Sequence, residues 1–262
     1  MTVLDRFRLD GRVALVSAGA GPLFGGSISG ALAEAGATVI TASRSRERNE
    51  SFATELKARS LDACGMQLDI SDPTAIDRLG DEIDSRFGRL DILVNSAVAR
   101  TGHVGSFAEQ TVENLRDAAA GDFVGLFRIC QRFIPGMLQR GRGSIINISS
   151  IYGVAANDFP LYAGTDMKQP PSYNFLKAGM INFTRYLASL YSRNGVRTNC
   201  VSPGGYLDNQ PASFVEAYER RVPIGRMLGA EDLQGAVVFL ASDASNYVTG
   251  ANIMVDGGWT CL

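Results

Sequence analysis

Short apolar runs alternate with longer amphipathic segments along the whole 262-residue chain. The runs lack a polar residue at every second position, so each is expected to be buried on both faces of a sheet. Strands are predicted over residues 13–16, 38–42, 63–68, 90–94, 143–148, 196–201 and 252–255. Helices are predicted over residues 27–35, 46–60, 73–87, 109–139 and 173–193. This alternation predicts an α/β fold, a doubly wound and mostly parallel sheet of about seven strands with helices on both faces.

Local signals mark several of these boundaries. Gly36 is expected to stop the first helix. Either Ser71 or Asp72 can cap the helix whose first residue is Pro73. No repeat, low-complexity tract or linker divides the sequence, so residues 1–262 are expected to form a single domain.

Composition limits the classes of partner. The chain is 45% hydrophobic and 20% charged, with a net charge of −2 and an isoelectric point near 5.5. This balance argues against nucleic acid or an anionic membrane as the main partner. The uncharged stretch over residues 13–33 is interrupted by glycine and proline, so no membrane span is expected. Charges among the first ten residues leave no room for a signal peptide, which favours a cytoplasmic location.

The cysteines and the histidine carry little metal chemistry. Cys64, Cys130, Cys200 and Cys261 lie far apart and form no metal-binding or redox spacing. They are typical of thiols in a reducing compartment. His103 is the only histidine, which excludes a site built from several histidines. No metal site is expected.

A glycine-rich turn follows the first predicted strand. Gly19, Gly21 and Gly25 stand between that strand and the first helix. A strand, a glycine turn and a helix form the context in which a helix N-terminus binds a pyrophosphate. The spacing does not fit the standard dinucleotide fingerprint. A tight turn without a ligand explains the segment as well.

Tyr173 and Lys177 stand one helical turn apart in the segment Ser-Tyr-Asn-Phe-Leu-Lys. Residues at this spacing share a helix face. A nearby ammonium lowers the pKa of a tyrosine, which is otherwise near ~10, and makes it a usable proton donor and acceptor. Such pairs are also common on helices without any catalytic role.

With its glycine-rich turn and its Tyr173–Lys177 pair, the sequence resembles the single-domain branch of the short-chain dehydrogenase/reductase family. The resemblance extends from about Leu9 to Trp259. The motifs that carry the resemblance stand in the family's order, and they cover residues 15–19, 68–70, 91–97, 143–150, 173–177, 201–205 and 248–258. The resemblance implies a Rossmann-type fold. It also implies hydride transfer between a nicotinamide cofactor and an alcohol or carbonyl substrate.

The resemblance assigns roles to three catalytic residues. Ser150 would polarise the substrate oxygen, Tyr173 would be the general acid or base, and Lys177 would lower its pKa and hold the nicotinamide ribose. Tyr173 follows Ser150 by 23 positions, more than is usual in the family. Tyr162 is nearer the usual distance, but Asp166 rather than a lysine stands four residues after it, so Tyr173 is preferred.

The resemblance also implies a set of cofactor-binding residues. They are Gly19, Gly21, Leu23, Phe24, Gly25, Ser43, Arg44, Asp69, Ile70, Asn95, Ser96, Ala97, Tyr173, Lys177, Pro203 and Gly204. In this set Asp69 would accept a hydrogen bond from the adenine amine, and otherwise it is a turn residue at a strand end.

Three positions depart from the family pattern. Leu23 replaces the middle glycine of the turn, so the backbone must approach the pyrophosphate differently, with Gly21 and Gly26 able to shift the bend. Asp122 replaces the asparagine that holds a proton-relay water, and it either holds that water or is a helix residue without a relay role. Val98 follows Asn-Ser-Ala and narrows the space near the cofactor.

The end of the second strand bears on the choice of cofactor. A site that prefers NAD places a carboxylate there for the ribose 2′-hydroxyl. This chain has Ser43 followed by Arg44, which offer a hydrogen bond and a charge-assisted pair to a 2′-phosphate. NADP is therefore favoured and NAD stays possible. The alternative is a solvated basic start to the next helix.

The sequence gives only general expectations for the substrate and the oligomeric state. Residues 151–172 and 205–223 are expected to form substrate loops for a small carbonyl or alcohol compound. A catalytically inactive dinucleotide-binding sensor or scaffold is the alternative function. A homotetramer is expected, with a dimer as second choice, and the helix at residues 109–139 would form one contact. The uncharged tail at residues 257–262 would form another, since an isolated terminus would expose the only tryptophan, Trp259.

Overall fold

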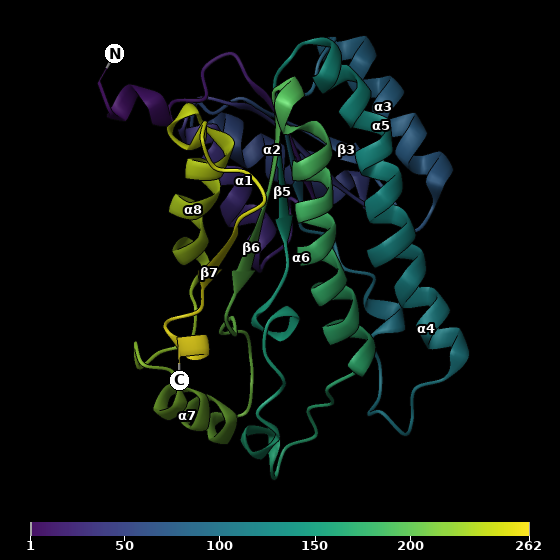
Figure 1. The fold of residues 1–262 in the computed structure, drawn as a ribbon, viewed down its shortest axis with the longest axis vertical. Coiled ribbons are helices and arrows are strands. Elements are labelled where there is room, and N and C mark those ends of the chain that lie inside the picture. Colours follow the sequence, from purple (N-terminus) through teal and green to yellow (C-terminus); the bar gives the residue numbers. More distant parts are fainter. Residues whose placement is uncertain (1, 262) are drawn as a thin grey trace.

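A computed structural model describes residues 2–261, and its seven strands form one parallel sheet (Figure 1). The strands are β1 (Val13–Ser17), β2 (Thr38–Ser43), β3 (Ala63–Gln67), β4 (Ile92–Asn95), β5 (Gly143–Ile148), β6 (Val196–Pro203) and β7 (Asn252–Val255). Their spatial order is β3-β2-β1-β4-β5-β6-β7. The predicted fold class is confirmed, because buried apolar strands alternate with covering helices.

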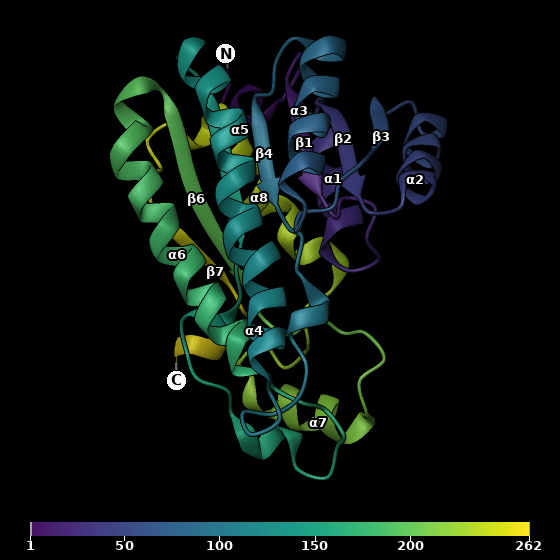
Figure 2. The ribbon, with the colours of Figure 1, turned by 90° about the vertical axis from the view of Figure 1, so that its right-hand side faces the viewer.

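Helices cover both faces of the sheet. The α-helices of the chain are α1 (Phe24–Glu34), α2 (Arg46–Ala58), α3 (Pro73–Phe87), α4 (Val112–Ala119), α5 (Leu126–Gln139), α6 (Pro171–Tyr191), α7 (Ala212–Arg221) and α8 (Gln234–Ala241). α3, α5 and α6 pack on one face, and α1 and α8 pack on the other (Figures 1 and 2). Among the helices of residues 2–261, none combines the length and the apolar character needed to span a bilayer.

The strand order reverses direction at β1. β1 pairs with β2 on one side and with β4 on the other. Chain connections leave to opposite sides at this point, which opens a crevice at the carboxyl ends of the strands. The fold therefore places the glycine-rich turn after β1 beside the segments that follow β2 and β4.

One of two helix starts with a predicted boundary differs from expectation, and the other agrees with it. The α1 helix begins at Phe24, three residues before its predicted start. For α3 the cap is Asp72, whose carboxylate accepts a hydrogen bond from the Thr74 N–H at 2.8 Å. Pro73 is the first residue of that helix, as predicted.

The helix predicted over residues 109–139 is found as an unbroken helical run over residues 112–139, but it contains a π-helical turn that was not predicted. The segment is divided into α4, a π-helical turn at Ala120–Gly125, and α5. The turn packs against the segment after β3, where a β-carbon at Gly125 would come within 2.1 Å of the Ile70 carbonyl oxygen. The sequence periodicity does not reveal the turn, because the chain stays helical through it.

The C-terminal tail packs within its own chain. The Trp259 side chain is 2% exposed and stacks on Tyr218, with ring centroids 4.6 Å apart. The Arg221 guanidinium lies 4.9 Å from the centroid of the same indole. The expectation that an isolated chain would expose Trp259 is therefore wrong, because α7 folds back over the tail.

Candidate functional site

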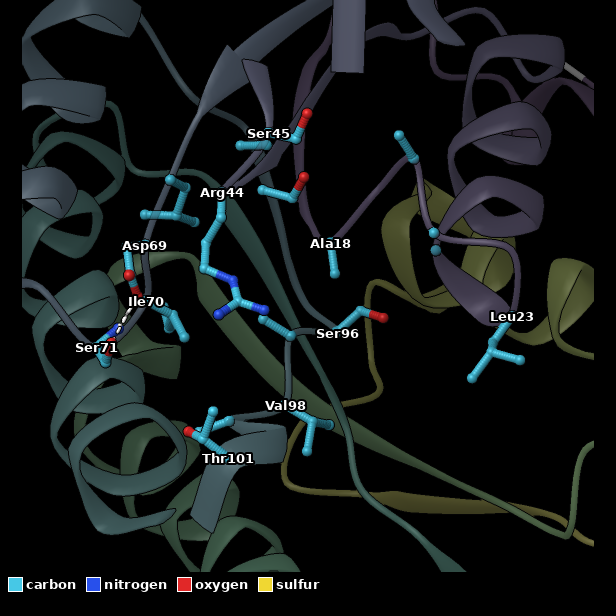
Figure 3. A pocket seen from close by; sticks show the side chains of 18 of the residues that line it. Ala18, Leu23, Arg44, Ser45, Asp69, Ile70, Ser71, Ser96, Val98 and Thr101 are labelled. Carbon is cyan, nitrogen blue, oxygen red and sulfur yellow. Dashed lines mark hydrogen bonds between the residues drawn. The ribbon is translucent and has the colours of Figure 1, made fainter. Parts of the chain in front are cut away.

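A cleft of about 1100 Å³ lies at the carboxyl ends of β1 to β4 (Figure 3). Its walls come from the β1–α1 turn, the ends of β2 and β3, the segment after β4, and the start of α6. The predicted site residues that line it are Gly21, Leu23, Phe24, Gly25, Ser43, Arg44, Asp69, Ile70, Ser96, Ala97 and Tyr173. Segments far apart in the sequence thus meet where the strand order reverses.

The β1–α1 turn presents backbone donors to this cleft. The Gly26 N–H donates to the Gly21 carbonyl at 2.9 Å, which closes the bend around Leu23. No side chain caps α1, and the first N–H groups of a helix have no intrahelical acceptor. Phe24 and Gly25 belong to this first turn and line the cleft. An uncapped helix start at the cleft wall fits a pyrophosphate.

Basic and hydroxyl side chains gather at the end of β2. The Arg44 side chain extends into the cleft (Figure 3), and no carboxylate of residues 2–261 lies within ion-pair distance of it. The Ser43 hydroxyl donates to Asn49 Oδ1 at 3.0 Å. Ser45 caps α2 by accepting from the Arg48 N–H at 3.2 Å. Arg48 and Ser45 also line the cleft, although the sequence motifs did not indicate them.

Asp69 and Ile70 follow β3 and lie beside Arg44 in the wall of the cleft (Figure 3). Asp69 Oδ1 accepts from the backbone N–H of Ser71 at 3.0 Å and from its hydroxyl at 2.6 Å (Figure 3). The carboxylate therefore orders this turn, and its second oxygen takes no part in these bonds.

The segment after β4 is fixed by hydrogen bonds to β1. The Ser17 hydroxyl oxygen accepts from the N–H groups of Ser96 and Ala97, at 2.9 and 3.0 Å. Asn95 itself is buried and donates to Asn147 Oδ1 at 2.8 Å. It does not line the cleft, and it supports the junction between β4 and β5.

The tyrosine–lysine pair lies at the start of α6. Tyr173 lines the cleft, and the buried Lys177 Nζ lies 5.6 Å from the centroid of its ring. Lys177 also donates to the Ile148 carbonyl at 2.8 Å. Ser150 follows β5, and its Oγ accepts from the Tyr152 N–H at 3.1 Å. Neither Ser150 nor Lys177 contributes to the cleft surface itself, since both are buried.

Tyr162 is set apart from this constellation. Its hydroxyl pairs with that of Tyr152, and its ring lies 5.2 Å from that of Phe214. Burial raises the pKa of both Tyr152 and Tyr162. Both phenols therefore stay protonated at neutral pH, and Tyr162 does not line the cleft.

The remaining predicted positions do not line the cleft. The Gly19 carbonyl accepts from the Ser29 hydroxyl at 2.8 Å. Pro203 ends β6, and the Gly204 N–H donates to the Val255 carbonyl at 2.9 Å. Asp122 lies in the π-helical turn and is buried.

Sequence reasoning missed His103. It lines the cleft, lies 2.8 Å from Asp122 through Nε2, and meets the Tyr173 ring edge-on at 5.4 Å. Its position 70 residues before the tyrosine formed no motif. The one available signal was Asp122 itself, because a buried carboxylate in place of an asparagine needs a partner.

Comparison with known proteins identifies the family. The family model described as enoyl-(acyl carrier protein) reductase matches residues 24–260. The chain belongs to the short-chain dehydrogenase/reductase family. The resemblance found in the sequence is thereby confirmed, and the chain is an oxidoreductase of a family that uses nicotinamide dinucleotides.

Several relatives span nearly the whole chain. D-threitol dehydrogenase of Mycolicibacterium smegmatis is 32% identical over 260 residues, which cover 97% of this chain and 95% of the relative. Ribulose-forming D-arabinitol 2-dehydrogenase of Scheffersomyces stipitis is 33% identical over 284 residues, covering 99% and 97%. The solved structure of a gluconate 5-dehydrogenase from Burkholderia cenocepacia, in complex with NADP and tartrate, has a TM-score of 0.90 and 29% identity, with full coverage of both chains.

Proposed function

We propose that this short-chain dehydrogenase/reductase transfers a hydride between a nicotinamide dinucleotide and a carbonyl or alcohol substrate, with Tyr173 as the general acid or base. One observation carries the proposal. Among the described residues that line the cleft, Tyr173 is the one tyrosine. The uncapped start of α1 lies in the wall of the same cleft. The phosphate-binding and proton-transfer groups thus share one cavity.

Each catalytic side chain has spare hydrogen-bonding capacity for this role. The bound nicotinamide supplies or accepts the hydride. In the reductive direction, Tyr173 gives its hydroxyl proton to the substrate oxygen as that oxygen gains negative charge. The Ser150 Oγ accepts from the Tyr152 N–H, so its own hydrogen is available to the same oxygen. Lys177 uses one of its three N–H groups on Ile148, which leaves two for the ribose.

The end of β2 supports NADP over NAD. Ser43, Arg44 and Arg48 line that part of the cleft, and the acidic residues of the lining, Asp69 and Asp117, come from other segments. A guanidinium forms charge-assisted hydrogen bonds with a phosphate, whereas NAD offers only a hydroxyl there. The NADP named in the gluconate 5-dehydrogenase complex agrees with this choice.

The substrate is proposed to be a small polyhydroxylated alcohol or its carbonyl counterpart. Threitol, arabinitol and gluconate are named for relatives of this chain. Residues 151–172 and 205–223 are proposed as substrate loops of a single domain. The first loop presents polar side chains near Tyr173, where the Asn174 amide donates to Asn157 Oδ1 at 2.6 Å.

A kinetic experiment tests this function. NADPH and NADH turnover is measured with a panel of D-threitol, D-arabinitol, D-gluconate, their keto forms, and an acetoacetyl thioester. Tyr173→Phe is expected to bind cofactor like the parent and to lower kcat by about 100-fold or more. Near-normal kcat in Tyr173→Phe contradicts the assignment. Cofactor binding without turnover of any compound would favour the alternative, a dinucleotide-binding sensor or scaffold.

A homotetramer, or a dimer, is proposed as the functional assembly. A row of aromatic rings runs from the π-helical turn across α5 to α6, and the centroids of the Phe127 and Phe183 rings at its centre are 4.1 Å apart. Its two ends, Phe123 and Tyr186, are exposed. Such a face is suited to a two-fold contact with a second copy. A cytoplasmic location is also proposed, supported by the free thiols of all four cysteines.

A further inference from the structure

His103 links three segments in the wall of the cleft. Its Nε2 lies 2.8 Å from Asp122 Oδ2 in the π-helical turn. Its Nδ1 lies 3.1 Å from the hydroxyl of Ser172 in the first turn of α6. The His103 and Asp122 side chains are 6% and 2% exposed. The single histidine therefore sits in a nearly dry network next to the proposed catalytic tyrosine.

The partners of this network determine where its hydrogens lie. Asp122 Oδ1 accepts from the Ala99 N–H at 2.7 Å, so Oδ2 is left for the imidazole. An ionised carboxylate only accepts, so Nε2 of His103 must carry a hydrogen. The Gln110 amide donates to the Ser172 hydroxyl oxygen at 2.5 Å, which leaves the hydroxyl hydrogen for Nδ1. With these hydrogens, both nitrogens of His103, both carboxylate oxygens of Asp122 and the Ser172 hydroxyl each form a hydrogen bond with a suitable partner.

The imidazole also contacts the tyrosine directly. The His103 and Tyr173 rings meet edge-to-face, with centroids 5.4 Å apart and planes at 86°. Edge-to-face contacts between aromatic rings are favourable and restrict ring orientation. His103 thus holds Tyr173 through its ring and through the neighbouring Ser172.

We propose that His103, oriented by Asp122, is a positioning residue that fixes the Tyr173 ring toward the cleft. This inference rests on the proposed function of Tyr173. It also gives Asp122 a definite task, because both carboxylate oxygens already bind protein groups. An asparagine at position 122 would bind His103 more weakly than Asp122 does, since a charged acceptor strengthens a hydrogen bond.

The serine–histidine–aspartate order of the network does not indicate a hydrolase. The Ser172 side chain is buried, and its oxygen accepts from Gln110. A nucleophile needs an exposed oxygen within reach of a substrate carbonyl. Both nitrogens of His103 are engaged as well, so the ring is held in place rather than left available to carry protons.

The single histidine gives the first test a unique signal. The free protein is labelled with [¹⁵N]histidine, and the ring nitrogens are observed by NMR in the parent, Asp122→Asn, Ser172→Ala and Val104→Ala. The parent is expected to show Nε2 protonated. Asp122→Asn shifts the ring signals, because an amide oxygen cannot replace both carboxylate acceptors. Ser172→Ala moves the Nδ1 signal, whereas the loop control Val104→Ala leaves both signals in place.

Two NMR outcomes overturn the proposal. One is a parent ring that exchanges between both tautomers like a free imidazole. The other is a set of ring signals that neither Asp122→Asn nor Ser172→Ala moves. Two variants are used so that, if one of them fails to fold, the other still tests the proposal. None of these measurements needs a substrate, so they stay informative if the proposed function fails.

Kinetics tests the link to Tyr173 with the panel compound that the parent turns over fastest. His103→Ala is expected to lower kcat by about 10- to 100-fold, because small misplacements of a catalytic group are costly. The KM for NADPH stays near the parental value, whereas a general structural defect would change both. Parental kcat in His103→Ala, beside a slow Tyr173→Phe, overturns this inference alone. Normal turnover in Tyr173→Phe overturns the proposed function instead.

Discussion

Gly25, at the start of α1, lies so close to Ala18 that a β-carbon at position 25 would come within 2.0 Å of the Ala18 carbonyl oxygen. The two residues frame the entry to the cleft. The glycine-rich turn can keep its bend only while position 25 lacks a side chain.

Gly25→Ala is therefore expected to displace the turn and to weaken NADPH binding. The free energy of unfolding should fall by about 1–3 kcal/mol, as for other overpacked sites. Fluorescence titration with NADPH and thermal unfolding measure the two effects. Gly30→Ala is the matched control on the same helix, since its β-carbon would meet no atom within 4 Å apart from the neighbouring backbone of its own helix. An equal response of both variants would contradict the role given to Gly25.

Arg44→Asp should weaken NADPH binding by about tenfold or more, because a charge-assisted bond to the phosphate becomes a repulsion. NADH binding should change much less. Titration of both cofactors against the parent and the variant measures the difference. Lys57→Asp makes the same charge change at an exposed site near the end of α2, and it is expected to leave both affinities unchanged. A parent that prefers NADH would show the proposal to be wrong.

Trp259→Ala should lower the free energy of unfolding by about 3–5 kcal/mol, the range for truncating a buried aromatic side chain. The stacking on Tyr218 and the contact with Arg221 are lost together. Chemical unfolding followed by circular dichroism measures the change. Tyr247→Ala truncates a fully exposed aromatic side chain and should be nearly neutral. Equal stability of the two variants would argue against a tail packed within its own chain.

The combined change Phe123→Glu and Tyr186→Glu should reduce the assembly to smaller species. It places charges at both ends of the aromatic row, in the π-helical turn and on α6, where a two-fold contact would bury them without partners. Light scattering gives the mass of the parent and of the variant. Tyr247→Glu, also exposed, is the control. A monomeric parent, or an unchanged mass in the double variant, would refute the proposed face.

Sequence alone determined the parts of this protein that depend on local periodicity. Buried apolar runs located all seven strands. Gly36 marked the end of α1 and Pro73 the start of α3, whereas α7 and α8 were not predicted. Tyr173 and Lys177 were paired correctly because a helical turn fixes their spacing within four residues. Short-range geometry of this kind follows directly from residue type.

Tertiary structure alone decided the contacts between distant segments. His103 meets Asp122 and Tyr173 only because the loop after β4, the π-helical turn and α6 converge at one sheet edge. The long helix predicted over residues 109–139 also contains a π-helical turn at Ala120–Gly125, which the sequence pattern did not reveal. Trp259 is buried because α7 folds over the tail. None of these contacts has a sequence period, since each depends on where the packed sheet brings separate chain segments together.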